Sequence, residues 1–78
     1  MRLFGKLLAK LNVTDPLASL TKREKQILAL LANGDSNKVI AQKLCISEST
    51  IKNHCWSIYR RLNARNRVEA ARIFWLHS

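Results

Sequence analysis

The fold is decided by the stretch Ile46-Ser47-Glu48-Ser49-Thr50-Ile51-Lys52-Asn53-His54. Its pattern predicts a turn, a serine helix cap and then a helix with one apolar side and one polar, cationic side. Immediately upstream, residues 37–44 (Asn-Lys-Val-Ile-Ala-Gln-Lys-Leu) predict a second short helix. Two short helices joined by a tight turn form a helix-turn-helix motif.

The helix that follows Ser47 is expected to run from about residue 48 to 62. At 100° per residue, its apolar positions fall within about 40° of one another: Ile51, Cys55, Ile58 and Leu62. The opposite side is polar, cationic and aromatic, and it carries Ser49, Asn53, Trp56 and Arg60, with Lys52 on its flank. This helix therefore packs through the first side and offers the second outward.

Two more helices are predicted around this pair. The first begins with the capping-box pattern Thr21-Lys22-Arg23-Glu24, in which Glu24 can also pair with Arg67, and it stops at Asn33-Gly34. The last begins with Asn66-Arg67-Val68-Glu69 and runs to about Leu76. Asp35 or Ser36 caps the helix of residues 37–44. The expected fold is an all-α four-helix bundle, with the helix-turn-helix as helices 2 and 3.

The N-terminus is expected to form a separate amphipathic segment and linker over residues 1–16, ahead of a domain over residues 17–78. Leucines recur every four residues at Leu3, Leu7 and Leu11, and Pro16 restrains the residue before it from helix. The segment suits a docking helix, a dimer contact, a partner-binding helix or an interfacial membrane helix. Packing or self-association is favoured, because three positive charges on one helix make a weak membrane anchor.

Charge narrows the class of partner. The 78 residues suffice for one domain, and 14 Lys and Arg against 5 acidic residues give a net charge of +9. That surplus points first to nucleic acid and second to an anionic membrane surface.

Other chemistry has no motif in this chain. Paired carboxylates, a glycine-rich phosphate loop and metal-ligand spacing are all missing, so we expect no enzyme activity, no metal and no cofactor. No secretory signal or membrane-length apolar run is visible, and the two cysteines are too few for a disulfide scaffold. We therefore expect a cytoplasmic protein with reduced thiols and no membrane partner.

Several motifs occur in a familiar order: Leu20-Thr21-x-Arg23-Glu24, Ala32-x-Gly34, Asn37-Lys38-x-Ile40-Ala41, Ile46-Ser47-x-x-Thr50-Ile51-Lys52-x-His54 and Asn66-Arg67-Val68-Glu69-Ala70. Over roughly residues 20–74, the chain resembles the LuxR/FixJ-type (GerE/NarL-like) regulators. The resemblance implies the four-helix DNA-binding domain of a bacterial transcription regulator, associated with the nucleoid when bound to DNA. It also implies a homodimer, since the last helix of this family commonly supports dimerisation.

The resemblance also implies roles for individual residues on double-stranded DNA. Base contacts fall to Lys52 and Asn53, which suit guanine and adenine respectively. Beside them, Trp56 is added as a base contact because of its position on this face, not because the family has it. Phosphate contacts fall to Asn37, Lys38, Ser49, Thr50, Arg60, Arg61 and Arg65. Leftover apolar residues on the last helix suggest a dimer interface at Ile73, Trp75 and Leu76.

This chain departs from the family pattern at several places. Trp56 stands where the family often has a polar or basic residue, and it can pack on a thymine methyl, on a sugar or flat against its own helix. Cys55 replaces an aliphatic residue, and Asn63-Ala64 stands where a glycine is common. With no room for an N-terminal receiver or sensor domain, the chain suits either a stand-alone effector or an excised output domain.

Two rival functions use the same residues differently. The helix-turn-helix can serve as a scaffold for a protein-interaction module that binds RNA polymerase or forms mixed dimers with another regulator. A membrane-surface role is the third possibility. The basic outer face argues against the interaction module as the sole role.

Overall fold

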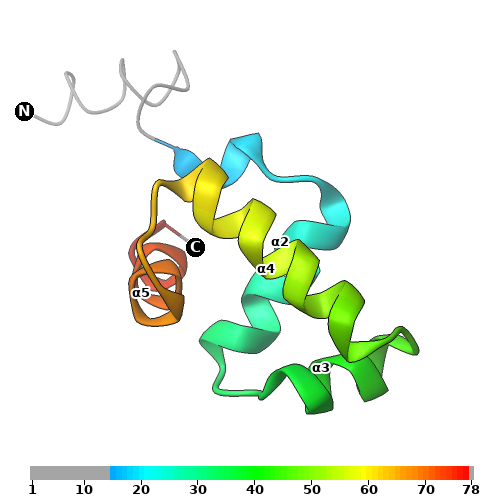
Figure 1. The fold of residues 1–78 in the computed structure, drawn as a ribbon. Helices are drawn as coiled ribbons and strands as arrows, with labels where there is room; N and C mark the ends of the chain where they lie inside the picture. Colours follow the sequence, from blue (N-terminus) through cyan, green and yellow to red (C-terminus); the bar gives the residue numbers. More distant parts are fainter. Residues whose placement is uncertain (1–14, 78) are drawn as a thin grey trace, which may run out of the picture.

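The computed structural model describes residues 15–77, which fold into helices and their connections (Figure 1). A short 3₁₀ helix, η1 (Pro16–Ser19), precedes four α-helices: α2 (Lys22–Ala32), α3 (Asn37–Leu44), α4 (Glu48–Leu62) and α5 (Arg67–His77). The all-α, four-helix prediction is confirmed, and α3 and α4 are the helix-turn-helix pair. Of the predicted N-terminal amphipathic segment and linker over residues 1–16, residues 1–14 lie outside the described residues.

Each α-helix begins where a side chain accepts a hydrogen bond from the first turn. Thr21 and Glu24 form the predicted capping box, with reciprocal bonds of 3.1 and 2.8 Å. Ser36 accepts from the amide of residue 39 at the start of α3, and Ser47 accepts from that of residue 50 at the start of α4. Asn66 does the same for α5. These bonds satisfy amides that have no partner within the helix, so the caps fix where each helix starts.

A residue with left-handed backbone terminates α3 and α4 and follows the C-cap of α2. Gly34 follows α2 with φ 101°, whereas α3 and α4 end at Cys45 with φ 58° and Asn63 with φ 56°. Asparagine adopts this region more readily than most residues, so Asn63 substitutes for the expected glycine after α4. Cys45 has no such advantage, and it lies in the turn between the two helices of the helix-turn-helix.

The core forms along the apolar side of α4. Its largest fully buried side chains are Ile27, Leu28, Ile40, Ile51 and Ile58, contributed by α2, α3 and α4. From α5, Ala70 is fully buried. In Figure 1, α5 lies to one side of the α2–α4 pair, and α3 lies near the N-terminal end of α4. The polar side of α4 is therefore left free on the outer surface.

Two expectations need correction. Glu24 pairs with Arg61, at 3.4 Å between Oε2 and Nε, and not with Arg67. Pro16, expected to interrupt the helical pattern, instead starts a helix: η1 is capped by Asp15 and packs against α4 and α5. Proline at a first helical position loses no hydrogen bond, which explains why the expected break is a helix start.

Candidate nucleic-acid interface

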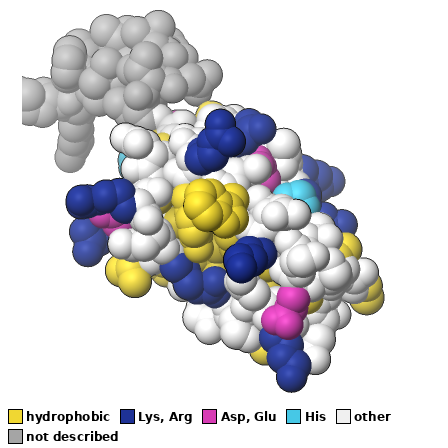
Figure 2. Space-filling view, in the orientation of Figure 1, with side chains coloured by type: hydrophobic (Ala, Val, Ile, Leu, Met, Phe, Trp, Pro, Cys, Tyr) yellow, Lys and Arg dark blue, Asp and Glu magenta, His cyan; other side chains and the backbone are white. Residues whose placement is uncertain are grey.

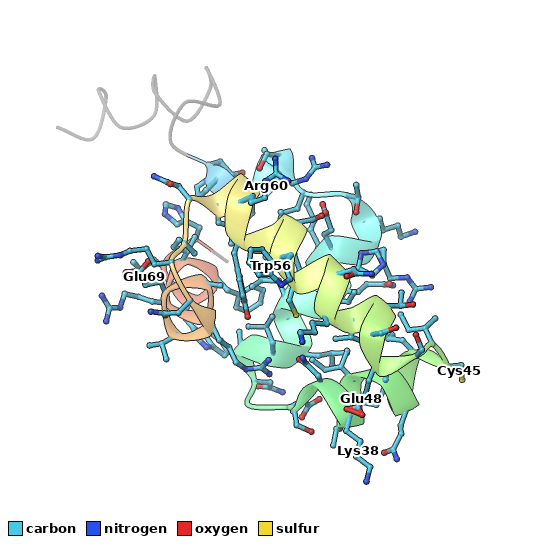
Figure 3. All side chains as sticks on the ribbon, viewed as in Figure 1. Lys38, Cys45, Glu48, Trp56, Arg60 and Glu69 are labelled. Carbon is cyan, nitrogen blue, oxygen red and sulfur yellow. The ribbon has the colours of Figure 1, made fainter. Side chains whose placement is uncertain are left out.

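The outer face of α4 brings together the three residues predicted to contact bases. Lys52, Asn53 and Trp56 are all exposed, and the indole of Trp56 is 63% accessible. Arg60 is exposed one turn further along, and Figure 3 shows Trp56 and Arg60 on the same side of the helix. Because the apolar side of α4 is held in the core, this face is presented on a rigid element.

The N-terminal turn of α4 gathers three hydroxyl groups. The Oγ of Ser47 lies 2.8 Å from Oγ1 of Thr50 and 3.4 Å from Oγ of Ser49. Ser49 is exposed and Thr50 is half-buried. Lys38 is exposed in the first turn of α3 and extends from the lower edge of the molecule in Figure 3. Hydroxyls and a lysine near two helix N-termini favour an anion such as a phosphate.

Asn37 has an internal function that the sequence did not reveal. Its Oδ1 accepts a hydrogen bond from Nη1 of Arg67 at 3.0 Å and a weaker one from the thiol of Cys55 at 3.9 Å. Arg67 also donates to the backbone carbonyl of Asp35. The start of α5 is thereby tied to the start of α3 and to the middle of α4. The sequence predicts Arg67 within a cap pattern and as a partner of Glu24, and nothing local marks its contact with Asn37 thirty residues away.

The three arginines predicted near phosphates occupy different settings. Arg60 is exposed and forms none of the ion pairs found among residues 15–77. Arg61 donates to the carbonyl of Ser19 at 3.0 Å and pairs with Glu24, so it joins α4 to η1 and α2. Arg65 pairs with Glu69 at 3.1 Å.

Glu69 organises the turn between α4 and α5. Its Oε1 accepts from the backbone amide of Arg65 at 2.6 Å, and its Oε2 accepts from the guanidinium of the same residue. The backbone hydrogen bond, helped by the positive charges of Arg65 and Arg72, lowers the pKa of the Glu69 carboxyl below its ordinary value. The charged form of Glu69 is thus the one that holds the turn.

A groove of about 730 Å³ opens beside Trp56. Its described lining residues include no acid, and they combine two aromatic rings with four cationic side chains: Trp56, Tyr59, Lys52, Arg60, Arg65 and Arg67. Figure 2 shows an apolar patch at the centre of this face with Lys and Arg side chains around it. Burial raises the pKa of the Cys55 thiol and of the Tyr59 hydroxyl, so both remain neutral at pH 7.

A second, apolar surface lies on α5. Val68, Trp75 and Leu76 are 67%, 60% and 71% exposed, while Ile73 is half-buried against the core. The indole Nε1 of Trp75 donates to the carbonyl of Ala32 at 3.1 Å, which anchors one edge of the ring to the end of α2. Val68 was not predicted as an interface residue. Val68 is seven positions before Trp75, which is two turns along one side of the helix, and that spacing was the available signal.

Two other classes of site find no support in the described part of the chain. Residues 15–77 contain no group of three His, Cys, Asp or Glu side chains placed to hold a metal ion. Within the same range, no helix has the length and apolar character to cross a membrane.

Residues 18–74 match the GerE family model, described as "Bacterial regulatory proteins, luxR family". The chain is 50% identical over 60 residues to the nitrate/nitrite response regulator protein NarP of Escherichia coli, and 45% identical over 69 residues to a nitrate/nitrite response regulator protein homolog of Haemophilus influenzae. It is 41% identical over 71 residues to the transcriptional regulatory protein LiaR of Bacillus subtilis.

These matches cover 77%, 88% and 86% of this chain, in that order, but only 28%, 33% and 34% of the relatives. The chain therefore spans about a third of the length of the curated relatives it matches. The matched part includes α2 to α4 and most of α5.

Proposed function

Because the chain belongs to the luxR family of bacterial regulatory proteins, we propose that it reads a specific sequence in double-stranded DNA and thereby regulates transcription. In this proposal α4 lies in the major groove and α3 braces it against the backbone. The protein acts as a dimer on two related half-sites, in the bacterial cytoplasm. The relatives named as regulators support the general class of function, and the residue roles below rest on the geometry of α4 and α3.

The observation that carries the proposal is the outer face of α4. It places Lys52, Asn53 and Trp56 side by side and exposed, in a domain whose family consists of regulators. A lysine can donate to O6 and N7 of guanine, and an asparagine amide can pair with N6 and N7 of adenine. The face therefore has the donors and acceptors that major-groove edges require.

Phosphate contacts are assigned by which groups remain free. Lys38 and Arg60 are exposed and form no ion pair among the described residues. The hydroxyls of Ser49 and Thr50 lie against Ser47 Oγ, and each keeps further capacity to bond a phosphate. Asn37 uses Oδ1 for its internal bonds, which leaves both amide hydrogens to donate to a phosphate. We assign a weaker, long-range role to the following two arginines, whose carboxylate partners offset their charge: Arg61 and Arg65.

Dimerisation is assigned to α5. Val68, Trp75 and Leu76 expose apolar surface on this helix, whereas the residues assigned to bases are on α4. The same exposed residues favour a second candidate function, in which α5 contacts RNA polymerase or another regulator. Self-association remains the primary proposal because most oligomers of soluble proteins are symmetric and pair the same patch from two copies.

The experiment that tests the proposal is selection of binding sites from a random duplex pool at about 0.15 M salt. At this ionic strength, exposed charges more than about 8 Å apart interact only weakly. We expect enrichment of a repeated half-site, inverted or direct, whose spacing reports the geometry of the dimer. Non-specific affinity should also fall steeply as salt rises, because counterions are released from the phosphates.

Two results would contradict the proposal. Binding to duplex DNA without enrichment of any sequence would show a basic surface that does not read bases, and would favour the interaction module. Absence of binding to every duplex at low salt would remove DNA as a direct partner of this chain.

A further inference from the structure

Trp56 contributes little to the hydrophobic core, because most of its side chain is exposed. On α4 the core is served by Ile51, Cys55 and Ile58, which are 0%, 4% and 0% exposed, whereas the indole of Trp56 lies on the other side at 63% exposure. A large apolar side chain exposed on a rigid helix commonly marks a binding surface.

The surroundings of Trp56 favour a polyanion over an apolar protein partner. Lys52 lies one turn before it and Arg60 one turn after it, both exposed. The groove beside the ring adds further cationic residues and, among its described lining, no acid. Figure 3 places Trp56 midway along α4, with Arg60 beyond it on the same side. The exposed apolar residues of α5 belong to a different helix.

We infer that Trp56 recognises the C5-methyl group of a thymine in the major groove, an inference that rests on the proposed function. Base edges in the major groove present hydrogen-bond donors and acceptors and one apolar group, the thymine methyl. The faces of an indole cannot satisfy donors and acceptors, but they pack well against a methyl. Trp56 thus selects T·A over other pairs at one position in each half-site.

The helix geometry places that thymine relative to the base read by Lys52. Four residues of α-helix advance about 6 Å, and base pairs repeat every 3.4 Å or so along the duplex axis. The thymine therefore lies about two base pairs from the guanine assigned to Lys52. A selected half-site should contain a fixed T·A pair at this position.

The test removes the methyl group from the DNA and the indole from the protein. Each thymine of the selected site is replaced singly by deoxyuridine, which keeps the base pair and lacks only the methyl, and binding is measured by gel mobility shift. For the wild-type chain we expect affinity to fall about fourfold at one thymine per half-site, the value of one buried methyl, and to change little at the others. Trp56→Ala should bind the thymine and deoxyuridine duplexes equally at that position.

Two further variants separate methyl recognition from general damage. Trp56→Phe keeps an apolar ring and should retain part of the thymine preference. Asn53→Ala removes a neighbour on the same face and should leave the thymine-to-deoxyuridine ratio unchanged while lowering affinity overall. Because Trp56 is exposed, its removal leaves no cavity in the core, and helical circular dichroism should match the wild type.

The outcomes are distinct. The inference would be overturned if the wild type bound the thymine and deoxyuridine duplexes equally. It would also be overturned if Trp56→Ala lost the same affinity for every single-base variant of the site, and that result would place the indole on the sugar-phosphate backbone. A selected half-site without a fixed T·A pair would overturn it as well. These results leave the proposed function standing. Failure to select any sequence would remove the proposed function and the inference together.

Discussion

Two exposed lysines illustrate how position decides the role of a residue. Lys38 lies in the first turn of α3, where the backbone amides and the helix dipole already favour an anion. Lys52 lies beyond the first turn of α4, on the face that carries Asn53 and Trp56. The proposed function therefore assigns the same ammonium group to a phosphate in one place and to a base edge in the other.

Alanine substitution of each lysine should separate the two roles. Lys38→Ala is expected to weaken binding to every duplex by a similar factor and to reduce the salt slope by about one unit. Lys52→Ala is expected to relax preference at one base position, by about 1–3 kcal/mol if the contact is bidentate. Affinities for the selected site and for its single-base variants, measured at several salt concentrations, provide the comparison. A uniform loss for both variants would contradict the base-reading assignment of Lys52.

For single residues, the sequence predicts which side chains of α4 are exposed, but it does not predict which distant residues contact each other. A rotation of 100° per residue places Lys52 and Trp56 away from the core as soon as Ile51 and Ile58 are assigned to it. The contacts of Arg61 with Glu24 and of Arg67 with Asn37 depend on how helices cross, and sequence spacing carries no information about that.

At the scale of elements, the turn of the helix-turn-helix contains a strained residue. Cys45 ends α3 with φ 58°, and it is exposed, so its side chain contributes little packing. Left-handed backbone costs a residue with a Cβ roughly 1–2 kcal/mol, and glycine avoids that cost but is more flexible when unfolded. We expect Cys45→Gly to raise the free energy of unfolding by about 0.5–1 kcal/mol and Cys45→Val to lower it by at least about 1 kcal/mol.

Urea unfolding followed by circular dichroism measures both effects, and Asn63→Gly at the end of α4 is the matched control. Its φ of 56° is nearly the same, but asparagine tolerates it better, so the gain there should be smaller. If Cys45→Gly lowered the free energy of unfolding, the side chain of Cys45 would contribute more to stability than its exposure indicates.

The turn between α4 and α5 should respond to acid through Glu69. The hydrogen bond from the amide of Arg65 lowers the pKa of this carboxyl below its ordinary value of 4.5, so the unfolded chain takes up the proton first as pH falls. The stability that Glu69 provides is therefore complete above pH 4.5 and is lost as pH falls through the lower, folded-state pKa. Glu69→Gln keeps an acceptor for the Arg65 amide but cannot titrate.

The denaturation midpoint of the wild type should consequently fall more steeply below pH 4.5 than that of Glu69→Gln. The remaining acidic residues are common to both proteins, so their titration cancels in the comparison. Parallel curves through this range would show that Glu69 does not couple the turn to pH.

Helix limits were predictable because caps are local. Thr21, Ser36, Ser47 and Asn66 each mark a start through a bond to an amide three residues on, a relation that sequence spacing expresses directly. By contrast, η1 is not predictable locally, because Asp15-Pro16 by itself indicates an interruption. What makes it a helix start is its packing on α4 and α5, which only the tertiary structure reveals.

At the scale of the whole molecule, two surfaces of different chemistry occupy different helices. The cationic face of α4 suits a duplex, whereas the apolar residues Val68, Trp75 and Leu76 of α5 suit another copy of the chain. A protein that binds two half-sites needs both surfaces at once. Disruption of the second should therefore affect paired half-sites and spare single ones.

Leu76→Ser tests this division without changing the charge. Leu76 is 71% exposed in the single chain, so its replacement costs little core packing. If a symmetric dimer buries it from both sides, the loss is about 1.5 kcal/mol for each copy, or about a hundredfold in the dimerisation constant. Sedimentation should show more monomer, and affinity for the two-half-site duplex should fall while affinity for one half-site stays constant. Unchanged binding to both duplexes would place the dimer contact elsewhere.

The distribution of the two tryptophans gives the molecule a built-in optical readout. The chain contains two, Trp56 on the face assigned to DNA and Trp75 on the face assigned to the partner copy. Both indoles are largely exposed, so each should emit at long wavelength in the free protein and shift when its own surface is covered. Trp75→Phe leaves a fluorophore that senses the duplex, and Trp56→Phe leaves one that senses the second copy. Steady-state emission of these two variants would report DNA binding and self-association separately, without any attached label.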